Sequence, residues 1–111
     1  MANPQAPADA FSTVELHPDD NIVVTKRGLA AGTLIVVRGR RMAIAQDVPM
    51  GHKIAIRRIH SGEKVVKFGA AIGSAAGSIE AGEHVHLHNL RSDYIPAHDR
   101  SVTGRTNGAG E

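Results

Sequence analysis

The chain has 111 residues, a formal net charge of +2 and no cysteine. This length suits one small domain. The lack of cysteine excludes disulfides, thiolate zinc sites and a thiol nucleophile, and it fits a cytoplasmic protein. No apolar run is long enough to span a membrane. The amino-terminal residues lack the basic and apolar regions of a signal peptide, so we expect no membrane association.

The basic residues are concentrated in the middle of the chain. Residues 22–67 contain ten Lys or Arg against two acids, whereas the remaining residues contain three against nine. Such a region is either solvated surface or attracts an anion, which could be a small carboxylate or an acidic partner surface. Nucleic acid is not expected as a partner. The aromatic platforms of single-strand binders are missing, because only 3% of the residues are aromatic.

Composition divides the chain into three parts. Residues 1–16 are rich in Ala, Pro, Asp and Gln, and residues 95–111 are rich in Gly, Ser, Thr and Asn. We predict a flexible tail at each end. The folded domain is expected at residues 17–94. A domain of this size gains stability from association, so a partner subunit or a homo-oligomer is expected.

One short pattern occurs four times in the predicted domain. It reads apolar, x, x, Gly, x, x, apolar. A glycine between two apolar anchors is typical of a tight turn that enters a strand, because glycine tolerates positive φ. The pattern therefore predicts four turn-plus-strand units. The central glycines are Gly32, Gly51, Gly62 and Gly82.

The remaining patterns also favour β structure. Strands are predicted within residues 21–25, 33–37, 52–59, 63–69 and 83–90, because these runs are β-branched or alternate in polarity. A hairpin with a turn at Gly39-Arg40 is expected within residues 36–45. Residues 69–79 contain three glycines spaced four apart, and we expect either a glycine-rich turn or a close approach of the backbone there, with at most one helical turn. The sequence predicts a mostly β fold with little helix.

Three histidines alternate in the stretch "GEHVHLHNL", at positions 84, 86 and 88. On one extended strand they would share a face, with neighbours roughly 6.6 Å apart. Two such imidazoles can converge on one ion, but the outer two are about twice as far apart, so a metal site would need ligands from elsewhere. Three interpretations stay open: a solvated strand face, metal ligation by two histidines, and contact with substrate or another subunit.

A second candidate is the turn "GHK", which contains His52 and Lys53. A histidine beside a lysine on a glycine turn could bind an anion or act as an acid/base pair. The alternative is an ordinary solvent-exposed turn. The sequence contains no P-loop, no GxSxG motif and no convincing pair of carboxylates.

Three motifs carry a resemblance to a known family. They are "DVPMGHKIA", "GEKVVKFGAAIG" and "IEAGEHVHLHN", in this order. Together they resemble the amino-terminal SAF-type domain of the altronate and galactarate dehydratases. The resemblance implies a small β-clip, antifreeze-like fold. It further implies an enzyme that eliminates water from an aldonate or aldarate to give a 2-keto-3-deoxy acid, and that uses iron.

The resemblance also implies that this chain is the small subunit, or an excised domain, of such a sugar-acid dehydratase, a lyase that is inactive without a large catalytic subunit. The iron (Fe²⁺) belongs to the assembled enzyme and need not bind this chain alone. The substrate would be an anionic sugar acid. The alternatives are the small subunit of a sulfolactate sulfo-lyase, a free-standing SAF carbohydrate-binding module, and an independent metalloprotein.

We expect one face of the chain to complete the active site on the large subunit. A histidine on that face could donate a proton to the leaving group or touch the metal. The assigned residues are His86 and His88 as catalytic groups, either of which is the metal ligand if this chain provides one, and His52, Lys53, His84 and Asn89 as substrate-binding groups.

Overall fold

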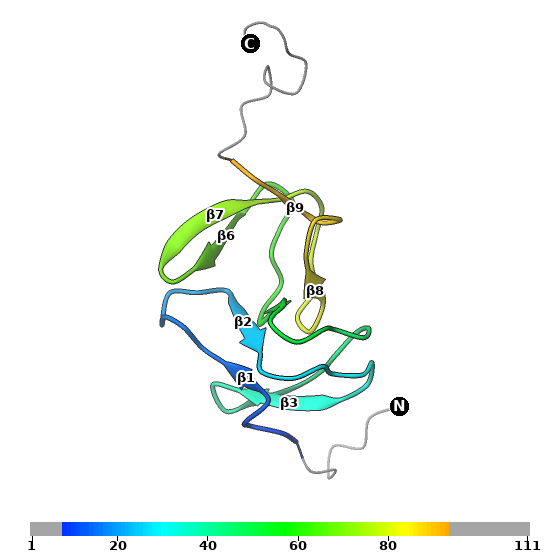
Figure 1. Cartoon of the computed structure of the whole chain (residues 1–111). Coiled ribbons are helices and arrows are strands. Elements are labelled where there is room, and N and C mark those ends of the chain that lie inside the picture. Colours follow the sequence, from blue (N-terminus) through cyan, green and yellow to red (C-terminus); the bar gives the residue numbers. More distant parts are fainter. Residues whose placement is uncertain (1–7, 94–111) are drawn as a thin grey trace, which may run out of the picture.

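A computed structural model describes residues 8–93 of the protein (Figure 1). This part is built from short β-strands and has no helix, so it has none that could cross a membrane. The prediction of a small, mostly β fold is confirmed. The strands are β1 (Thr13–Val14), β2 (Ile22–Thr25), β3 (Leu34–Val37), β4 (Arg40–Ala43), β5 (Lys53–Ala55), β6 (Lys64–Lys67), β7 (Ala70–Ala75), β8 (His84–Val85) and β9 (Leu90–Arg91).

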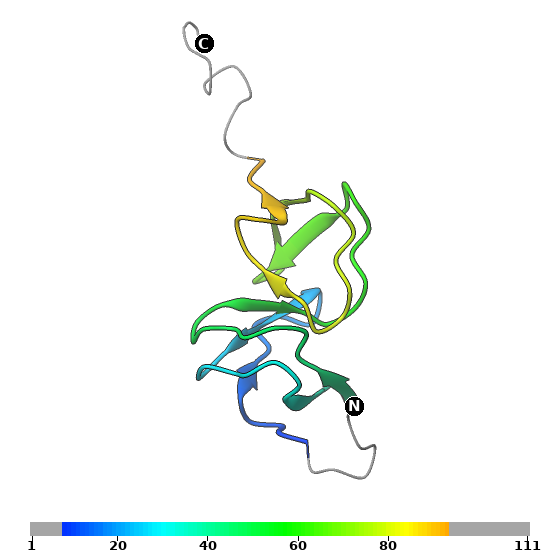
Figure 2. The same cartoon turned by 90° about the vertical axis from the view of Figure 1, so that its right-hand side faces the viewer.

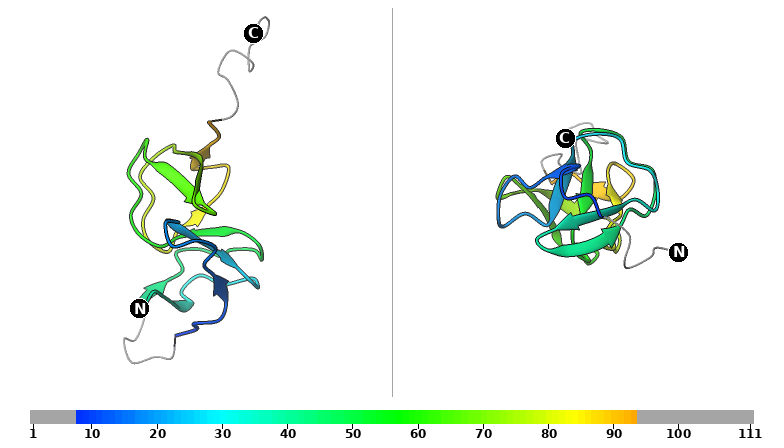
Figure 3. Two further views of the ribbon diagram at one scale, coloured as in Figure 1. Left: turned by 90° about the vertical axis from the view of Figure 1, so that its left-hand side faces the viewer. Right: turned by 90° about the horizontal axis from the view of Figure 1, so that it is seen from below.

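The strands form three small antiparallel sheets. One sheet has the order β1-β2-β5-β8, the second is the hairpin β3-β4, and the third has the order β6-β7-β9. Strands β6, β7 and β9 gather at one end of the domain, and β1 and β3 lie at the other, with β2 between them (Figure 1). Figures 2 and 3 show the same arrangement from other sides. The four-stranded sheet therefore connects the two ends.

The four predicted glycine turns are all present. Their central glycines have φ values between 81° and 91°, a region that side chains avoid and glycine adopts freely. The apolar residues on both sides of each glycine are almost fully buried. Each turn is thus fixed to the core at both ends. These anchors are Leu29, Ile35, Val48, Ile54, Ile59, Val65, Ile79 and Val85.

The turns combine in pairs to give two equivalent halves. Leu29 and Val48 form an antiparallel bridge, and Ile59 and Ile79, which follow them by 30 and 31 residues, form the same bridge. Each bridge has two reciprocal backbone hydrogen bonds of 2.7–2.9 Å. The fold is therefore a duplicated unit, and β5 takes part in both copies.

Each half has its own apolar core. Within a half, side chains from two glycine turns and the intervening strands pack together, and this burial is the main stabilising contribution. The first core contains Val23, Leu29, Ile35, Val37, Ile44, Val48 and Ile54. The second contains Ile22, Ala55, Ile59, Val65, Ala75, Ile79 and Val85.

Of the two alternatives predicted for residues 69–79, the close backbone approach is confirmed, and the glycine-rich turn is wrong for most of that segment. Residues 70–75 form β7, which pairs with both β6 and β9. The small residues serve close packing, because a Cβ on Gly73 would lie 2.3 Å from the backbone oxygen of Arg91. The pairing register also shifts between Val65 and Val66, so one residue of β7 bulges. Only Gly69, with φ of 74°, lies in a turn that requires glycine.

The boundaries of the hairpin and of the predicted tail also differ from expectation. The β3–β4 turn is at Arg38-Gly39, where both residues have positive φ, as a type I′ turn requires. Within the predicted tail of residues 1–16, β1 pairs with β2. The backbone of Asp9 exchanges hydrogen bonds with β3, and its side-chain Oδ2 accepts a hydrogen bond from Arg27 Nη2 at 2.7 Å. Residues 1–7 and 94–111 lie outside the described part.

Candidate active-site surface

The predicted histidine strand is shorter than expected. β8 ends at Val85, and residues 86–89 bend into a turn before β9. The side chain of Asn89 closes this turn: its Nδ2 donates to the backbone oxygen of His84 at 2.8 Å, and its Oδ1 accepts from the backbone nitrogen of His86 at 2.9 Å. The single face expected for three alternate histidines does not exist, because the strand is interrupted by a side chain that competes for its backbone groups.

The pairing of β5 with β8 explains why histidines from two motifs meet. Lys53 is opposite Val85 and Ile54 is opposite His84. One further step along this antiparallel pair brings His52 opposite His86. Directly opposite residues have Cβ atoms about 5 Å apart. Strand register thus places the glycine turn "GHK" and the stretch "GEHVH" side by side. The family resemblance led us to expect both on one face, but no local pattern in the sequence showed how they would meet.

The resulting histidine cluster consists of His52, His84 and His86. A hydrogen bond joins Nδ1 of His52 and Nε2 of His84 at 2.8 Å, so one nitrogen carries the proton and the other accepts it. The ring of His86 lies 4.6 Å from that of His52 and is stacked at 5.3 Å on that of His84. One nitrogen from each residue lies within 4.8 Å of the other two. The cluster can therefore bind one small group with three imidazoles.

The other predicted site residues border this cluster. The exposed ring of His88 lies 5.7 Å from the ring of His84. The half-buried Lys53 is close enough to lower the pKa of both His84 and His86. Asn89 uses both ends of its amide to hold the turn, as described above, so it positions the histidines. The structure therefore brings the four histidines together, with Asn89 holding the turn that carries them, whereas Lys53 pairs with the buried Val85 and so lies on the other face of the β5–β8 pair from His84.

Gln46 also supports the cluster and was missed by sequence reasoning. Its Oε1 accepts a hydrogen bond from the backbone nitrogen of His84 at 3.3 Å. The neighbouring Ala45 donates its backbone N–H to Gly82, at 3.0 Å. These contacts come from the first half of the duplicated fold and hold β8 in place. No local sequence signal marks Gln46, because its role depends on contacts across 38 residues.

The electrostatic environment favours the neutral form of His84 and His86. Desolvation lowers the pKa of His84, and the nearby His52, His86, His88 and Lys53 lower it further. Desolvation is also the main cause of the lowered pKa of His86. The pKa of Lys53 is lowered by its burial and then by the charge of Lys67. At neutral pH the two histidines are consequently in the neutral form, in which each imidazole has one nitrogen able to accept a hydrogen bond or bind a metal ion.

These shifts predict how stability depends on pH. Both histidines have a lower pKa in the folded chain than the ordinary value of 6.5. Below that pH the unfolded chain binds more protons than the folded chain, so the free energy of unfolding falls as the pH drops from about 7 through 6.5. Urea denaturation in the presence of EDTA, between about pH 7.5 and 5.5, measures this slope. An His84→Gln, His86→Gln double variant should have a shallower slope, and an unchanged slope would contradict the assignment.

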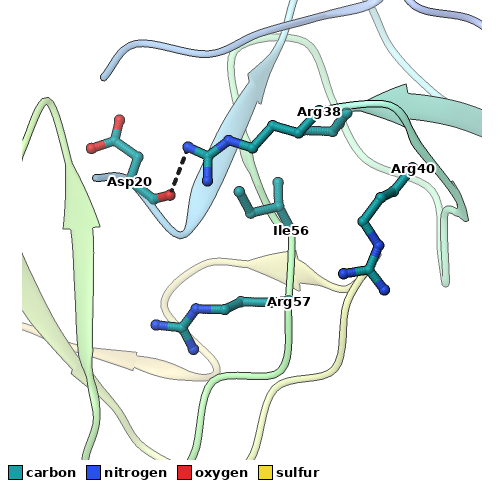
Figure 4. A pocket seen from close by; sticks show the side chains of 6 residues that line it. Asp20, Arg38, Arg40, Ile56 and Arg57 are labelled. Atoms are coloured by element: carbon teal, nitrogen blue, oxygen red, sulfur yellow. Dashed lines mark hydrogen bonds between the residues drawn. The ribbon is translucent and has the colours of Figure 1, made fainter. Parts of the chain in front are cut away.

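A second candidate feature is a pocket of about 160 Å³ near the β3–β4 turn (Figure 4). It is lined by Arg38, Arg40 and Arg57, with Ile56 among its apolar lining residues. Arg38 is held by Glu15 and by the backbone oxygen of Asp20, whereas Arg40 has no ion-pair partner within residues 8–93. The basic middle of the chain is thus gathered partly around one concave surface, which can accept an anionic group.

Comparison with known proteins identifies the family. The model of the altronate/galactarate dehydratase SAF domain matches residues 11–93. The chain belongs to this family. Altronate dehydratase of Escherichia coli strain K12 is 41% identical over 80 residues, which are 72% of this chain and 16% of that protein. Altronate dehydratase of Bacillus subtilis strain 168 is 33% identical over 94 residues, or 85% of this chain and 19% of that protein.

A third relative has a similar size to this SAF domain. It is the (2R)-sulfolactate sulfo-lyase subunit alpha of Chromohalobacter salexigens, 36% identical over 81 residues, which are 67% of this chain and 86% of that protein. The chain thus spans less than a fifth of the altronate dehydratases and most of the sulfo-lyase subunit. All three relatives are lyases, and the predicted membership of this SAF family is confirmed.

Proposed function

We propose that this SAF domain is the small component of a sugar-acid dehydratase and completes an active site whose main catalytic groups lie on a larger partner. The observation that carries the proposal is the convergence of His52 with His84 and His86. These residues come from two of the motifs that resemble the dehydratase family. The substrate would be an aldonate or aldarate, and the product a 2-keto-3-deoxy acid.

The chemistry of the reaction supports a shared active site. Elimination next to a carboxylate needs a base for the α-proton, a positive group to stabilise the enediolate, and an acid for the leaving hydroxyl. The cluster and Lys53 offer imidazoles and an ammonium group. The groups that perturb His84 are histidines and Lys53, with no carboxylate among them. This surface can bind an anion and transfer a proton, and we expect a partner to supply the remaining groups.

Residue roles follow from position and exposure. His88 is exposed beside His84, so it is the histidine best placed to give a proton to the leaving hydroxyl. Lys53, half-buried near two histidines, would bind the substrate carboxylate. We propose that the assembled enzyme contains iron, which would stabilise negative charge on the substrate oxygens. Asn89 contributes by holding the turn that carries these groups.

The surface around the cluster has properties of a docking face. Met50 and Leu87 are 68% and 84% exposed, and both are within two residues of a cluster histidine. Large exposed apolar side chains beside a functional cluster are typical of an interaction surface. The basic pocket, where Arg40 has no ion-pair partner among residues 8–93, would add attraction for an acidic partner surface. Both features support a larger partner that covers the histidines. We also propose that the enzyme is cytoplasmic, which the lack of cysteine supports.

A second candidate function is that of a sulfolactate sulfo-lyase subunit. The specific observation in its favour is that the aligned region covers 86% of the Chromohalobacter subunit alpha. The elimination is analogous, with sulfite as the leaving group in place of water. The same histidines and lysine could bind a sulfonate or a carboxylate, since both are anions.

Co-expression tests the proposal. The chain is produced together with the product of the neighbouring open reading frame, purified, and assayed under anaerobic conditions with Fe²⁺ on a panel of aldonates, aldarates and sulfolactate. Formation of a 2-keto-3-deoxy acid supports the dehydratase, and release of sulfite supports the second candidate. Absence of both a stable complex and activity would contradict the proposal and favour a free-standing SAF module.

A further inference from the structure

We propose that this chain itself contains a binding site for one divalent transition-metal ion, held by the imidazoles of His52, His84 and His86. The site is defined by residues of this chain alone and does not depend on the proposed function. The sequence predicted at most two ligands from the stretch 84–88. The structure supplies the third from the glycine turn at residue 52.

The geometry of the three rings is close to that of a metal site. Nitrogen ligands bind Zn²⁺ at about 2.0–2.1 Å, which places two ligand atoms of a tetrahedral ion about 3.4 Å apart. In the structure, one nitrogen of each histidine already lies within 4.8 Å of the others. Side-chain rotations can close this difference. The proton between His52 and His84 would move to the other nitrogen of its ring when the ion binds.

The ligand set indicates which ions fit. Imidazole suits Zn²⁺, Fe²⁺, Co²⁺ and Ni²⁺, whereas Mg²⁺ and Ca²⁺ prefer oxygen ligands. Three protein ligands leave at least one position open, as in catalytic metal sites. A divalent ion held by three neutral imidazoles keeps a net positive charge. The open position is therefore suited to an anionic oxygen ligand, and assigning the substrate carboxylate to it rests on the proposed function.

The backbone around the cluster is held by several contacts. Asn89 bonds the backbone of His84 and of His86, and Gln46 bonds the backbone nitrogen of His84. On the other strand, the backbone nitrogen of His52 donates to Oγ1 of Thr25 at 3.2 Å and to Pro49 at 3.3 Å. Such support lowers the cost of ordering the ligands when an ion binds.

The test is metal binding by the purified full chain without a histidine tag. The chain is stripped with EDTA and incubated separately with Zn²⁺, with Co²⁺, and with Fe²⁺ under anaerobic conditions. After gel filtration, elemental analysis should find one ion per chain, and Co²⁺ should give visible absorption bands. Substoichiometric or absent binding of all three ions at millimolar concentration would overturn the proposal.

Variants locate the ion. His52→Ala, His84→Ala and His86→Ala should each weaken binding by at least about 100-fold. His60→Ala is the matched control, because His60 is exposed on another glycine turn and should leave binding unchanged. Urea denaturation of each variant shows whether it folds. If a cluster variant is unfolded, NMR spectroscopy of the wild-type chain is used instead. Co²⁺ should then broaden the imidazole resonances of the three cluster histidines. Binding lost only in His60→Ala, or unchanged in folded cluster variants, would overturn the site.

This test is separate from that of the proposed function. One ion bound to the isolated chain, without lyase activity in any combination, would contradict the dehydratase and keep the metal site. If the assembled enzyme is active but the isolated chain binds no metal, the dehydratase is kept and the metal site is contradicted. The two proposals can therefore fail independently.

Discussion

Replacing Gly82 by alanine should lower the free energy of unfolding by about 2–5 kcal/mol. The residue has φ of 91°, and a Cβ there would lie 2.2 Å from the backbone oxygen of Ala43. A left-handed conformation costs a side-chain residue about 1–2 kcal/mol, and overpacking adds about 1–3 kcal/mol. Small domains are stable by only about 5–15 kcal/mol. Urea denaturation of the purified variant measures the loss.

The duplicated fold provides the matched control. Gly51 occupies the equivalent turn of the first half, with φ of 81°, but a Cβ there meets no atom within 4 Å. Gly51→Ala should therefore show only the conformational cost. Gly77→Ala, at an open position without positive φ, should be nearly neutral. Equal losses for Gly51→Ala and Gly82→Ala would mean that the close approach to Ala43 relaxes without cost.

The second large effect concerns catalysis by the assembled enzyme. His86→Ala should lower kcat/KM for the sugar acid by about 10²–10⁴, the range for loss of a positioned acid, base or metal ligand. The ring of His86 is stacked on His84 and lies 4.6 Å from His52, so its removal opens the cluster. Steady-state assays of the co-purified complex provide the measurement.

His60→Ala serves as the control for this experiment as well, because His60 lies outside the cluster. Gel filtration shows whether each variant still binds the partner. An assembled His86→Ala enzyme with unchanged kcat/KM would contradict the placement of the histidine cluster in the active site. A loss confined to assembly would assign His86 to the docking face.

Local patterns predicted much of the fold. The four glycine turns and their buried anchors follow from residues within seven positions of one another. Strands β2, β3, β5 and β6 were also expected, since β-branched runs favour strands. For residues 69–79 the sequence left a glycine-rich turn and a close backbone approach open, because the approach of Gly73 to Arg91 that decides between them is distant in sequence. The pairing of β1 with β2 was missed because residues 1–16 are polar and proline-rich, a composition that resembles a flexible tail.

The candidate site was predicted residue by residue but not in its geometry. The sequence singled out His52, Lys53 and the three histidines after Gly82. It could not reveal that β5 pairs with β8, because register depends on the whole sheet. It also could not show that Asn89 ends the strand, since that effect depends on a side chain bonding two backbone groups.

The duplication has a consequence for where chemistry can arise. In the first half, the positions equivalent to His52 and His86 are Ile22 and Ala55, which pair with each other and are fully buried beneath the second half. β8 is the last strand of the sheet as described, so no third unit covers His52 and His86. In repeat proteins the terminal unit needs a polar outer face. The histidines thus occupy the uncapped end of a two-unit array, and appending a third unit would abolish the site by burying it.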